Sequence, residues 1–262
     1  MMWNTANCDA DQGPASCAAI GLIVLSSDTV SEPEISAFLP RQGVGFYSSR
    51  VPMSEIATVE SLASMKPNIQ AAAKLLVPDD NIDVIGYGCT AAAILIGSDN
   101  IKQTIQETRK DPIAYSDPML AGLTALQTLH CQRIALLTPY IDSVGDVVSN
   151  HFEQQKITIV DKASFKKSGD PEIARISPQS IYQAAIDLTK DKDIDALFIS
   201  CTALRVFDVL ESIEQKIGKP VISSNQALAW HCLRLAGDDS KLEGRGQLFR
   251  TSLDSEISLK SI

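Results

Sequence analysis

Two stretches of this sequence decide its fold: IDVIGYGCTA at residues 82–91 and IDALFISCTA at residues 194–203. Ile, Asp, Cys, Thr and Ala recur at the same places in both copies. Each copy is a mostly apolar run that ends in a small residue, followed by Cys-Thr and a helix-like pattern. Such runs are typical of buried parallel strands, and open α/β sheets place their chemistry at the carboxyl ends of these strands. We therefore expect Cys89 and Cys201 at equivalent strand ends, each followed by a threonine able to cap the next helix.

The rest of the chain alternates apolar runs with helix-like patterns. Besides the two strands that end at these cysteines, strands are expected at residues 20–25, 44–51, 112–116, 133–140, 158–160 and 220–224. Helices are expected at residues 32–39, 55–76, 118–130, 142–155, 178–190, 204–217 and 225–235, and one more runs from the first Cys-Thr pair toward residue 109. A polar loop is expected at residues 168–172, and Asn225 as the cap of the last helix. Strands that alternate with helices predict parallel sheets covered by helices on both faces.

The two halves of the chain also match beyond the two quoted stretches. Residues 20–25 correspond to residues 134–138, and residues 112–116 to residues 220–224. A repeat this long predicts two similar lobes rather than a solenoid. We therefore expect an α/β fold of two pseudo-symmetric lobes, each a mainly parallel sheet flanked by helices.

Composition and charge narrow the function classes. The chain of 262 residues has a formal net charge of −9. Nucleic acids and anionic membranes bind clustered Lys and Arg, so neither is expected as a partner. No apolar run approaches the roughly 20 residues of a membrane span. Residues 1–19 lack the basic start and apolar core of a secretory signal and are interpreted as a flexible N-terminal extension of a cytoplasmic protein. Residues 238–262 are interpreted as a polar C-terminal extension.

The cysteines at the two strand ends are the candidate catalytic groups. A helix N-terminus offers unpaired N–H groups and a partial positive charge, which lower the pKa of a thiol and can hold a carboxylate or an oxyanion. The alternative is that each cysteine is simply buried, as free Cys often is. Their equivalent positions in a repeat favour a function. Cys131 and Cys232 are expected to be core or helix-end residues, and all six cysteines to be free thiols.

The sequence contains no motif for a cofactor or a metal. It lacks Gly-x-Gly-x-x-Gly after the first strand, a Walker loop and His-Glu-x-x-His. The three histidines are scattered, and the cysteines lack metal-binding spacing. We therefore expect no cofactor and no metal, and two thiols as the acid–base groups.

Several short motifs occur together along this chain. They are GLIV at residues 21–24, SS at 26–27, YGCT at 87–90, LTPY at 137–140, ARISP at 174–178, SCT at 200–202 and GKPVISSNQA at 218–227. In this combination the sequence resembles the aspartate/glutamate racemase superfamily, in the branch of maleate cis–trans isomerase and arylmalonate decarboxylase. The likeness spans about residues 20–237. Within the branch the chain is most similar to the racemase-like proteins of ectoine utilisation.

This resemblance implies an active site in the cleft between the two lobes, without a cofactor. It also implies that the last helix packs back on the first lobe, which then comprises residues 20–117 and 225–237, with residues 118–224 as the second lobe. Decarboxylase members share the second cysteine but lack the first, so the presence of both points to isomerases and racemases. In isomerase relatives one thiolate adds to the substrate double bond while the other cysteine handles the proton. In racemases one thiolate removes a proton and the opposite thiol returns one.

The resemblance also places side chains on the substrate. The expected substrate-binding residues are Ser27, Asp28, Thr90, Ala91, Tyr140, Asp170, Thr202 and Ala203, with Tyr140 holding a carboxylate. Maleate isomerases carry Asn in place of Asp28, and a second Asn near Asp170. Asn can donate a hydrogen bond to a carboxylate, whereas ionised Asp only accepts and repels it. A substrate with an ammonium or amidinium group beside one carboxylate therefore fits better. The alternative is that Asp28 merely caps the first helix.

Three hypotheses follow from these observations. The first is a cofactor-independent two-cysteine isomerase, of racemase or cis–trans type, acting on a small carboxylate that is an amino acid derivative linked to ectoine breakdown. The second is a cofactor-free decarboxylase or lyase that uses Cys201 alone as proton donor, with maleate cis–trans isomerase proper as a further alternative. The third is a non-catalytic binding relative, because fold does not fix function. A homodimer or a higher homo-oligomer is the assembly considered.

Overall fold

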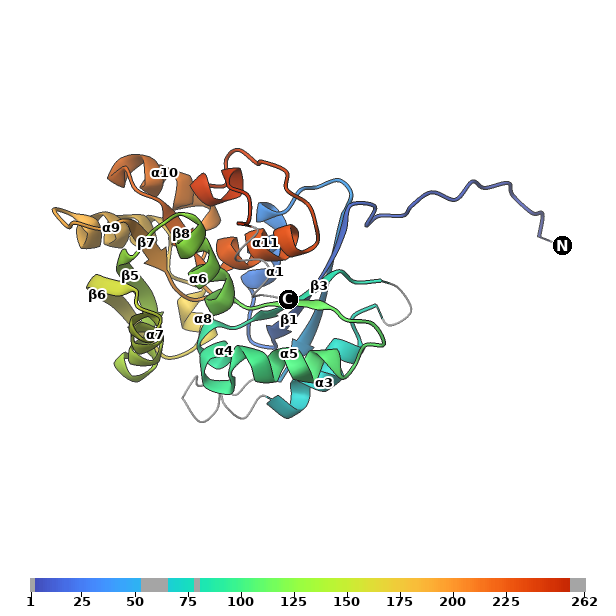
Figure 1. Cartoon of the computed structure of the whole chain (residues 1–262), viewed down its shortest axis with the longest axis horizontal. Coiled ribbons are helices and arrows are strands. Elements are labelled where there is room, and N and C mark those ends of the chain that lie inside the picture. The colour runs from blue at the N-terminus through green and yellow to red at the C-terminus, as the bar shows by residue number, and fades with distance from the viewer. Residues whose placement is uncertain (1–2, 53–65, 78–80, 255–262) are drawn as a thin grey trace.

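Two four-stranded parallel sheets form the framework of the protein (Figure 1). The computed structural model describes residues 3–52, 66–77 and 81–254. The first sheet contains β1 (Ala18–Leu25), β2 (Val44–Val51), β3 (Val84–Gly88) and β4 (Ala114–Ser116), in the order β2-β1-β3-β4. The second contains β5 (Arg133–Tyr140), β6 (Thr158–Lys167), β7 (Ala196–Ile199) and β8 (Val221–Ser223), in the order β6-β5-β7-β8. In both sheets the second strand along the chain lies at one edge, followed by the first, the third and the fourth. This shared order confirms the predicted α/β fold built on an internal repeat.

The strands follow the apolar pattern closely where they are buried. β1, β3 and β7 are buried along their whole length, as expected for the inner strands of a covered parallel sheet. β6 differs from the prediction, because it runs from Thr158 to Lys167 whereas only residues 158–160 were expected to be extended. It is an edge strand with half-buried and exposed residues, so it carries no continuous apolar run.

Five of the described helices lie in the first half of the chain. They are α1 (Ser31–Phe38), α3 (Lys66–Lys74), α4 (Thr90–Ile96), α5 (Ser98–Gln106) and α6 (Pro118–Thr128). The prediction of a single helix that runs toward residue 109 is wrong. α4 ends at Gly97, whose φ of +89° favours glycine, and α5 begins directly after this residue. Of the helix expected over residues 55–76, residues 53–65 lie outside the described residues.

Five of the described helices lie in the second half of the chain. They are α7 (Asp142–Gln154), α8 (Asp170–Ile173), α9 (Pro178–Thr189), α10 (Phe207–Ile217) and α11 (Ser224–Leu235). The loop expected at residues 168–172 contains the start of α8. The cap of α11 is Ser223 rather than Asn225, because the Ser223 hydroxyl and the Gln226 side chain form a reciprocal capping box.

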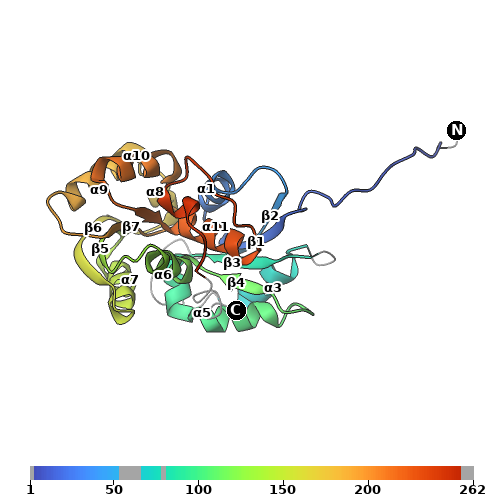
Figure 2. The same cartoon turned by 45° about the horizontal axis from the view of Figure 1, so that its top comes forward.

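Helices α6 and α11 hold equivalent places in the repeat and pack against each other. Each begins directly after the last strand of its sheet, α6 after β4 and α11 after β8. α11 also contacts α1, β1 and β3, so the helix that leaves the second sheet lies against the first one (Figure 2). This exchange brings the carboxyl ends of β3 and β7 toward each other.

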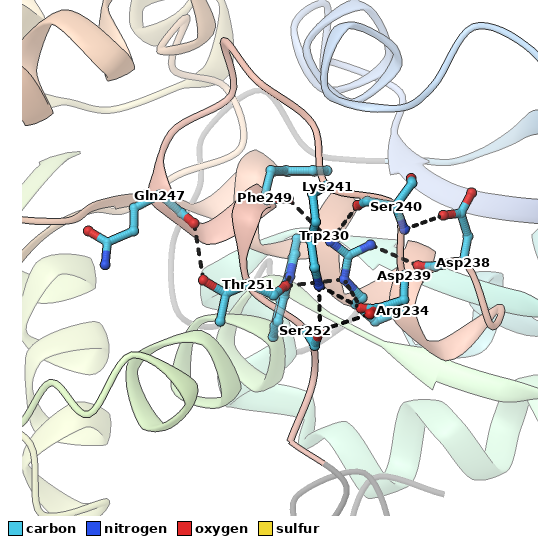
Figure 3. A network of polar contacts seen from close by, with 10 residues as sticks. All are labelled: Trp230, Arg234, Asp238, Asp239, Ser240, Lys241, Gln247, Phe249, Thr251 and Ser252. Carbon is cyan, nitrogen blue, oxygen red and sulfur yellow. Dashed lines mark hydrogen bonds and ion pairs between the residues drawn. The ribbon is translucent and has the colours of Figure 1, made fainter.

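The C-terminal segment folds back along α11 (Figure 3). The Arg234 side chain is almost fully buried and donates hydrogen bonds to backbone carbonyl oxygens of the segment, at Asp238, Ser240, Phe249 and Thr251. Phe249 is fully buried and stacks on Phe38 of α1, with 5.7 Å between ring centroids. Residues 238–251 are therefore part of the packed structure, which their polar composition did not indicate. No helix of the described residues is long and apolar enough to cross a membrane.

Candidate active site

Cys89 lies at the junction of β3 and α4. It is the N-cap residue of α4, in an extended conformation, and it is 7% exposed. The backbone N–H groups of Ala91 and Ala92 face its sulfur. This matches the arrangement expected from the sequence, a thiol at a strand end and a helix N-terminus.

Cys201 follows β7, but no helix begins beside it. α10 starts only at Phe207, and Cys201 has a φ of +110°, which is rare for a residue other than glycine and costs about 1–3 kcal/mol. Its N–H donates to the Ser224 hydroxyl over 3.1 Å, and its sulfur accepts the Ala203 N–H over 3.4 Å. The expectation that Cys201 sits at a helix N-terminus is therefore wrong.

The two Cys-Thr segments meet directly between the two sheets. The Thr202 hydroxyl donates to the carbonyl oxygen of Gly88 over 3.2 Å, which joins the residue after Cys201 to the residue before Cys89. The Thr90 hydroxyl lies 3.0 Å from the hydroxyl of Ser224. Neither threonine caps a helix, contrary to the prediction. Both bridge the two halves of the site instead.

Three further side chains surround the thiols. The Tyr140 hydroxyl, at the end of β5, hydrogen-bonds the Cys201 sulfur. The half-buried Asp170, at the start of α8, accepts a 2.5 Å hydrogen bond from the Ser27 hydroxyl, which follows β1. Asp170 lies close enough to both cysteines to raise the pKa of each thiol. The structure thus brings Ser27, Tyr140 and Asp170 to the cysteines, as the resemblance implied.

Asp28 has the structural role that was considered as the alternative. Its carboxylate accepts hydrogen bonds from the N–H groups of Val30 (2.7 Å) and Ser31 (2.8 Å) and from the Ser31 hydroxyl, at the start of α1. The side chain is only 2% exposed. It is still near enough to Cys89 and Asp170 to raise the pKa of both groups. Asp28 is therefore a helix cap that also contributes negative charge to the site.

The surroundings of both thiols raise their pKa. Burial, assisted by Asp170 and Asp28, raises the pKa of Cys89 to about 12. Burial and Asp170 raise the pKa of Cys201 well above its usual range, against the opposing hydrogen bonds from Tyr140 and Ala203. The expectation of a lowered thiol pKa is wrong, because desolvation outweighs the opposing hydrogen bonds at each thiol.

Sequence reasoning missed Ser224, Asn225 and Ser31 as residues of this region. Ser224 contacts both Cys-Thr segments, and the Asn225 side chain donates to the Thr202 carbonyl oxygen over 2.8 Å. Ser224 and Asn225 lie in the motif GKPVISSNQA, from which only a helix cap at Asn225 was predicted. A cavity of about 190 Å³ lies between β5, β6 and α7 and includes Tyr140 in its wall, but it does not include the cysteines. Among the described residues, no His, Cys, Asp and Glu side chains group to hold a metal.

Comparison with known proteins assigns the chain to a family. The family model described as arylmalonate decarboxylase matches residues 20–249. The chain belongs to this family. It is also 28% identical to the maleate isomerase of Nocardia farcinica over 242 residues, which cover 88% of this chain and 95% of that protein. The family thus includes relatives with two different activities.

Solved structures of maleate isomerases share the fold of this family member. The maleate-bound maleate isomerase of Pseudomonas putida superposes with a TM-score of 0.80 at 24% identity, covering 89% of this chain and 97% of that one. A mutant of the Nocardia farcinica maleate cis–trans isomerase with a covalently bound succinylcysteine intermediate gives a TM-score of 0.77 at 24% identity, covering 89% and 98%.

Proposed function

We propose that this protein is a cofactor-independent isomerase in which Cys89 and Cys201 act as a pair on a small carboxylate substrate. The observation that carries the proposal is that two thiols at equivalent strand ends are joined across the sheets by the Thr202–Gly88 hydrogen bond. The sequence relationship to maleate isomerases and the succinylcysteine intermediate of one of them support cysteine-dependent isomerisation. Such a pair suits isomerisation, because one group can act as base or nucleophile while the other supplies the proton.

The pair can act in two ways. In a racemisation, one thiolate removes the proton beside the carboxylate, and the opposite thiol gives a proton back on the other face. In a cis–trans isomerisation, one thiolate adds to a carbon of the double bond while the other cysteine protonates the neighbouring carbon. After rotation about the resulting single bond, loss of that proton and of the thiolate restores the double bond. The cis–trans cycle leaves both cysteines as they began. The racemisation exchanges the thiolate and the thiol between the two cysteines, and proton exchange with water restores the starting state. Neither cycle consumes a cofactor.

A substrate that carries an ammonium or amidinium group beside one carboxylate suits the charges of this site. Asp170 and Asp28 would repel a second carboxylate. A cation beside Asp170 would instead offset the negative charge that raises the pKa of both thiols, and so favour thiolate formation when the substrate binds. Tyr140 would then hold the carboxylate. We place the substrate among amino acid derivatives linked to ectoine breakdown, on the resemblance described above.

A decarboxylase is the second candidate, supported by the family model itself. In that reaction the carbon–carbon bond to a carboxylate breaks, carbon dioxide leaves, and Cys201 alone protonates the carbanion. Two further alternatives remain: the protein is a maleate cis–trans isomerase, or it binds a ligand without catalysis. Cys89, at the equivalent strand end, favours the two-cysteine reaction because a one-cysteine decarboxylase has no use for it.

Isotope exchange separates these candidates. Amino acid derivatives from ectoine breakdown, and maleate, should be incubated with the enzyme in D₂O. A racemase incorporates deuterium beside the carboxylate without loss of carbon, and a decarboxylase releases carbon dioxide. Conversion of maleate to fumarate identifies a maleate isomerase. Failure of every substrate in all three assays would support a binding relative.

A further inference from the structure

Helix α1 of the first half supports the loop that carries Cys201 in the second half. We define the Cys201 loop as residues 200–206, between β7 and α10. Ser31 of α1 lies with its hydroxyl 3.3 Å from the carbonyl oxygen of Thr202. One turn further along α1, the carboxylate of Glu34 accepts the N–H of Phe207, with distances of 3.0 and 3.2 Å to its two oxygens.

The Glu34 carboxylate supplies a helix cap that the second half lacks. α10 has Val206 as its N-cap residue, with no side-chain hydrogen bond to its first N–H groups. Ser, Thr, Asp and Asn are the residues that usually provide such a bond, and the preceding residues 203–206 include none of them. Glu34 provides the acceptor from another part of the chain and is only 8% exposed. A buried carboxylate in this place needs these donors.

The other end of the Cys201 loop is tied to the same carboxylate. Asn225 of α11 donates to the Thr202 carbonyl oxygen over 2.8 Å and is also within hydrogen-bonding reach of Glu34. Glu34 therefore contacts Phe207, the first residue after the loop, and Asn225, the side chain that holds Thr202 near the start of the loop. The residue next to Thr202 is Cys201, whose backbone is in the left-handed region. A strained conformation of this kind persists only where surrounding contacts fix it.

We propose that Glu34 is a positioning residue for Cys201: from α1 it fixes both ends of the Cys201 loop and so holds the Cys201 sulfur opposite Cys89. Glu34 touches neither thiol, so it acts through the loop. The consequence for turnover rests on the function proposed above, whereas the effect on the position and exposure of Cys201 does not.

The test compares the alkylation rates of the two cysteines by iodoacetamide, measured peptide by peptide with mass spectrometry. In Glu34→Ala the Phe207 N–H loses its acceptor, and the loosened loop exposes Cys201. Its alkylation should speed up by about five-fold, the effect of one lost buried hydrogen bond, while Cys89 stays within about two-fold. Glu34→Gln retains an acceptor oxygen and should behave like the wild type. Glu34→Asp keeps the charge but is shorter, so it should resemble Glu34→Ala.

Two controls make the result decisive. Ser36→Ala changes an exposed residue of the same helix and should leave both rates unchanged. Where the enzyme turns over a substrate, Glu34→Ala should lower kcat more than it raises KM, and Glu34→Gln should restore kcat. Equal acceleration at both cysteines would mean general loosening and would overturn the proposal, as would an unchanged Cys201 rate in Glu34→Ala and Glu34→Asp. Because alkylation needs no substrate, an enzyme without isomerase activity still gives a clear answer.

Discussion

The hydroxyl of Ser27 donates a 2.5 Å hydrogen bond to the carboxylate of Asp170, and this bond joins the turn after β1 to the start of α8 in the other half of the chain. It holds a carboxylate near both cysteine thiols, where that carboxylate raises the pKa of each. Asp170 is therefore well placed to control thiol reactivity.

Neutralising Asp170 should make both thiols more reactive. In Asp170→Asn the negative charge is gone, so the pKa of Cys89 and of Cys201 should fall. At pH 8 alkylation of both should speed up by about three-fold or more, since each pKa unit changes the thiolate fraction about ten-fold. Ser27→Ala is the matched control, because it removes the hydrogen bond and leaves the charge. Slower alkylation in Asp170→Asn would show that Asp170 does not raise the thiol pKa.

Asp28 should matter for stability through its cap. Asp28→Ala removes the acceptor for the N–H groups of Val30 and Ser31, so the free energy of unfolding should fall by about 1–2 kcal/mol. Asp28→Asn keeps one acceptor oxygen and should lose less. Denaturant unfolding of the three proteins measures the difference. Equal stability of Asp28→Ala and the wild type would contradict the capping role.

The same residue should affect substrate choice. If the substrate carries a cationic group, Asp28→Asn should weaken its binding by about two- to five-fold, because the buried Asp28 acts on the substrate only through a screened charge attraction of at most about 1 kcal/mol. The variant should also accept maleate better, because a repelling charge is gone. KM and kcat for both substrates, on both proteins, test this. Efficient turnover of maleate by the wild type would rule out the cationic substrate.

Glu34 should make stability depend on pH. Burial raises the pKa of Glu34 from 4.5 to about 7, so between these values the folded state binds a proton that the unfolded state does not. This contribution to stability is complete below the unfolded pKa and is lost as the pH rises through 7, by at most about 3 kcal/mol. Glu34→Gln lacks it. The wild type should lose more stability than Glu34→Gln between pH 5 and pH 8 in urea unfolding, and parallel curves would refute the shift.

The C-terminal segment should be needed for the stability of the core. Phe249→Ala leaves a cavity against Phe38 and should lower the free energy of unfolding by about 3–5 kcal/mol. Lys241→Ala, in the same segment, removes only exposed contacts and serves as the control. Thermal unfolding of both variants checks this. A loss of less than about 1 kcal/mol in Phe249→Ala would show that the segment is not part of the core.

The repeat of an apolar run followed by Cys-Thr was enough to predict two matching parallel sheets and the two cysteines at equivalent strand ends. This repeat did not predict the backbone conformation around Cys201. The sequence predicted a helix from residue 204, but the chain has a positive φ at Cys201 and α10 begins only at Phe207. The contacts that permit this come from Ser224 and Glu34, which are distant in the chain, and their approach depends on how the two sheets pack. The predicted length of the edge strand β6 was too short, because a partly exposed strand carries no continuous apolar run.

The most direct test of the two-cysteine site is deuterium incorporation into a small carboxylate substrate in D₂O by the wild type, Cys89→Ser and Cys201→Ser. An amino acid derivative with one carboxylate is the first choice, with mass spectrometry and chiral chromatography as the readouts. The wild type should incorporate deuterium beside the carboxylate without releasing carbon dioxide. Each single variant should be slower by about 10²–10⁴-fold, the usual contribution of a general acid or base. Full activity in Cys89→Ser, with carbon dioxide released, would contradict the two-cysteine isomerase and identify a decarboxylase that depends on Cys201.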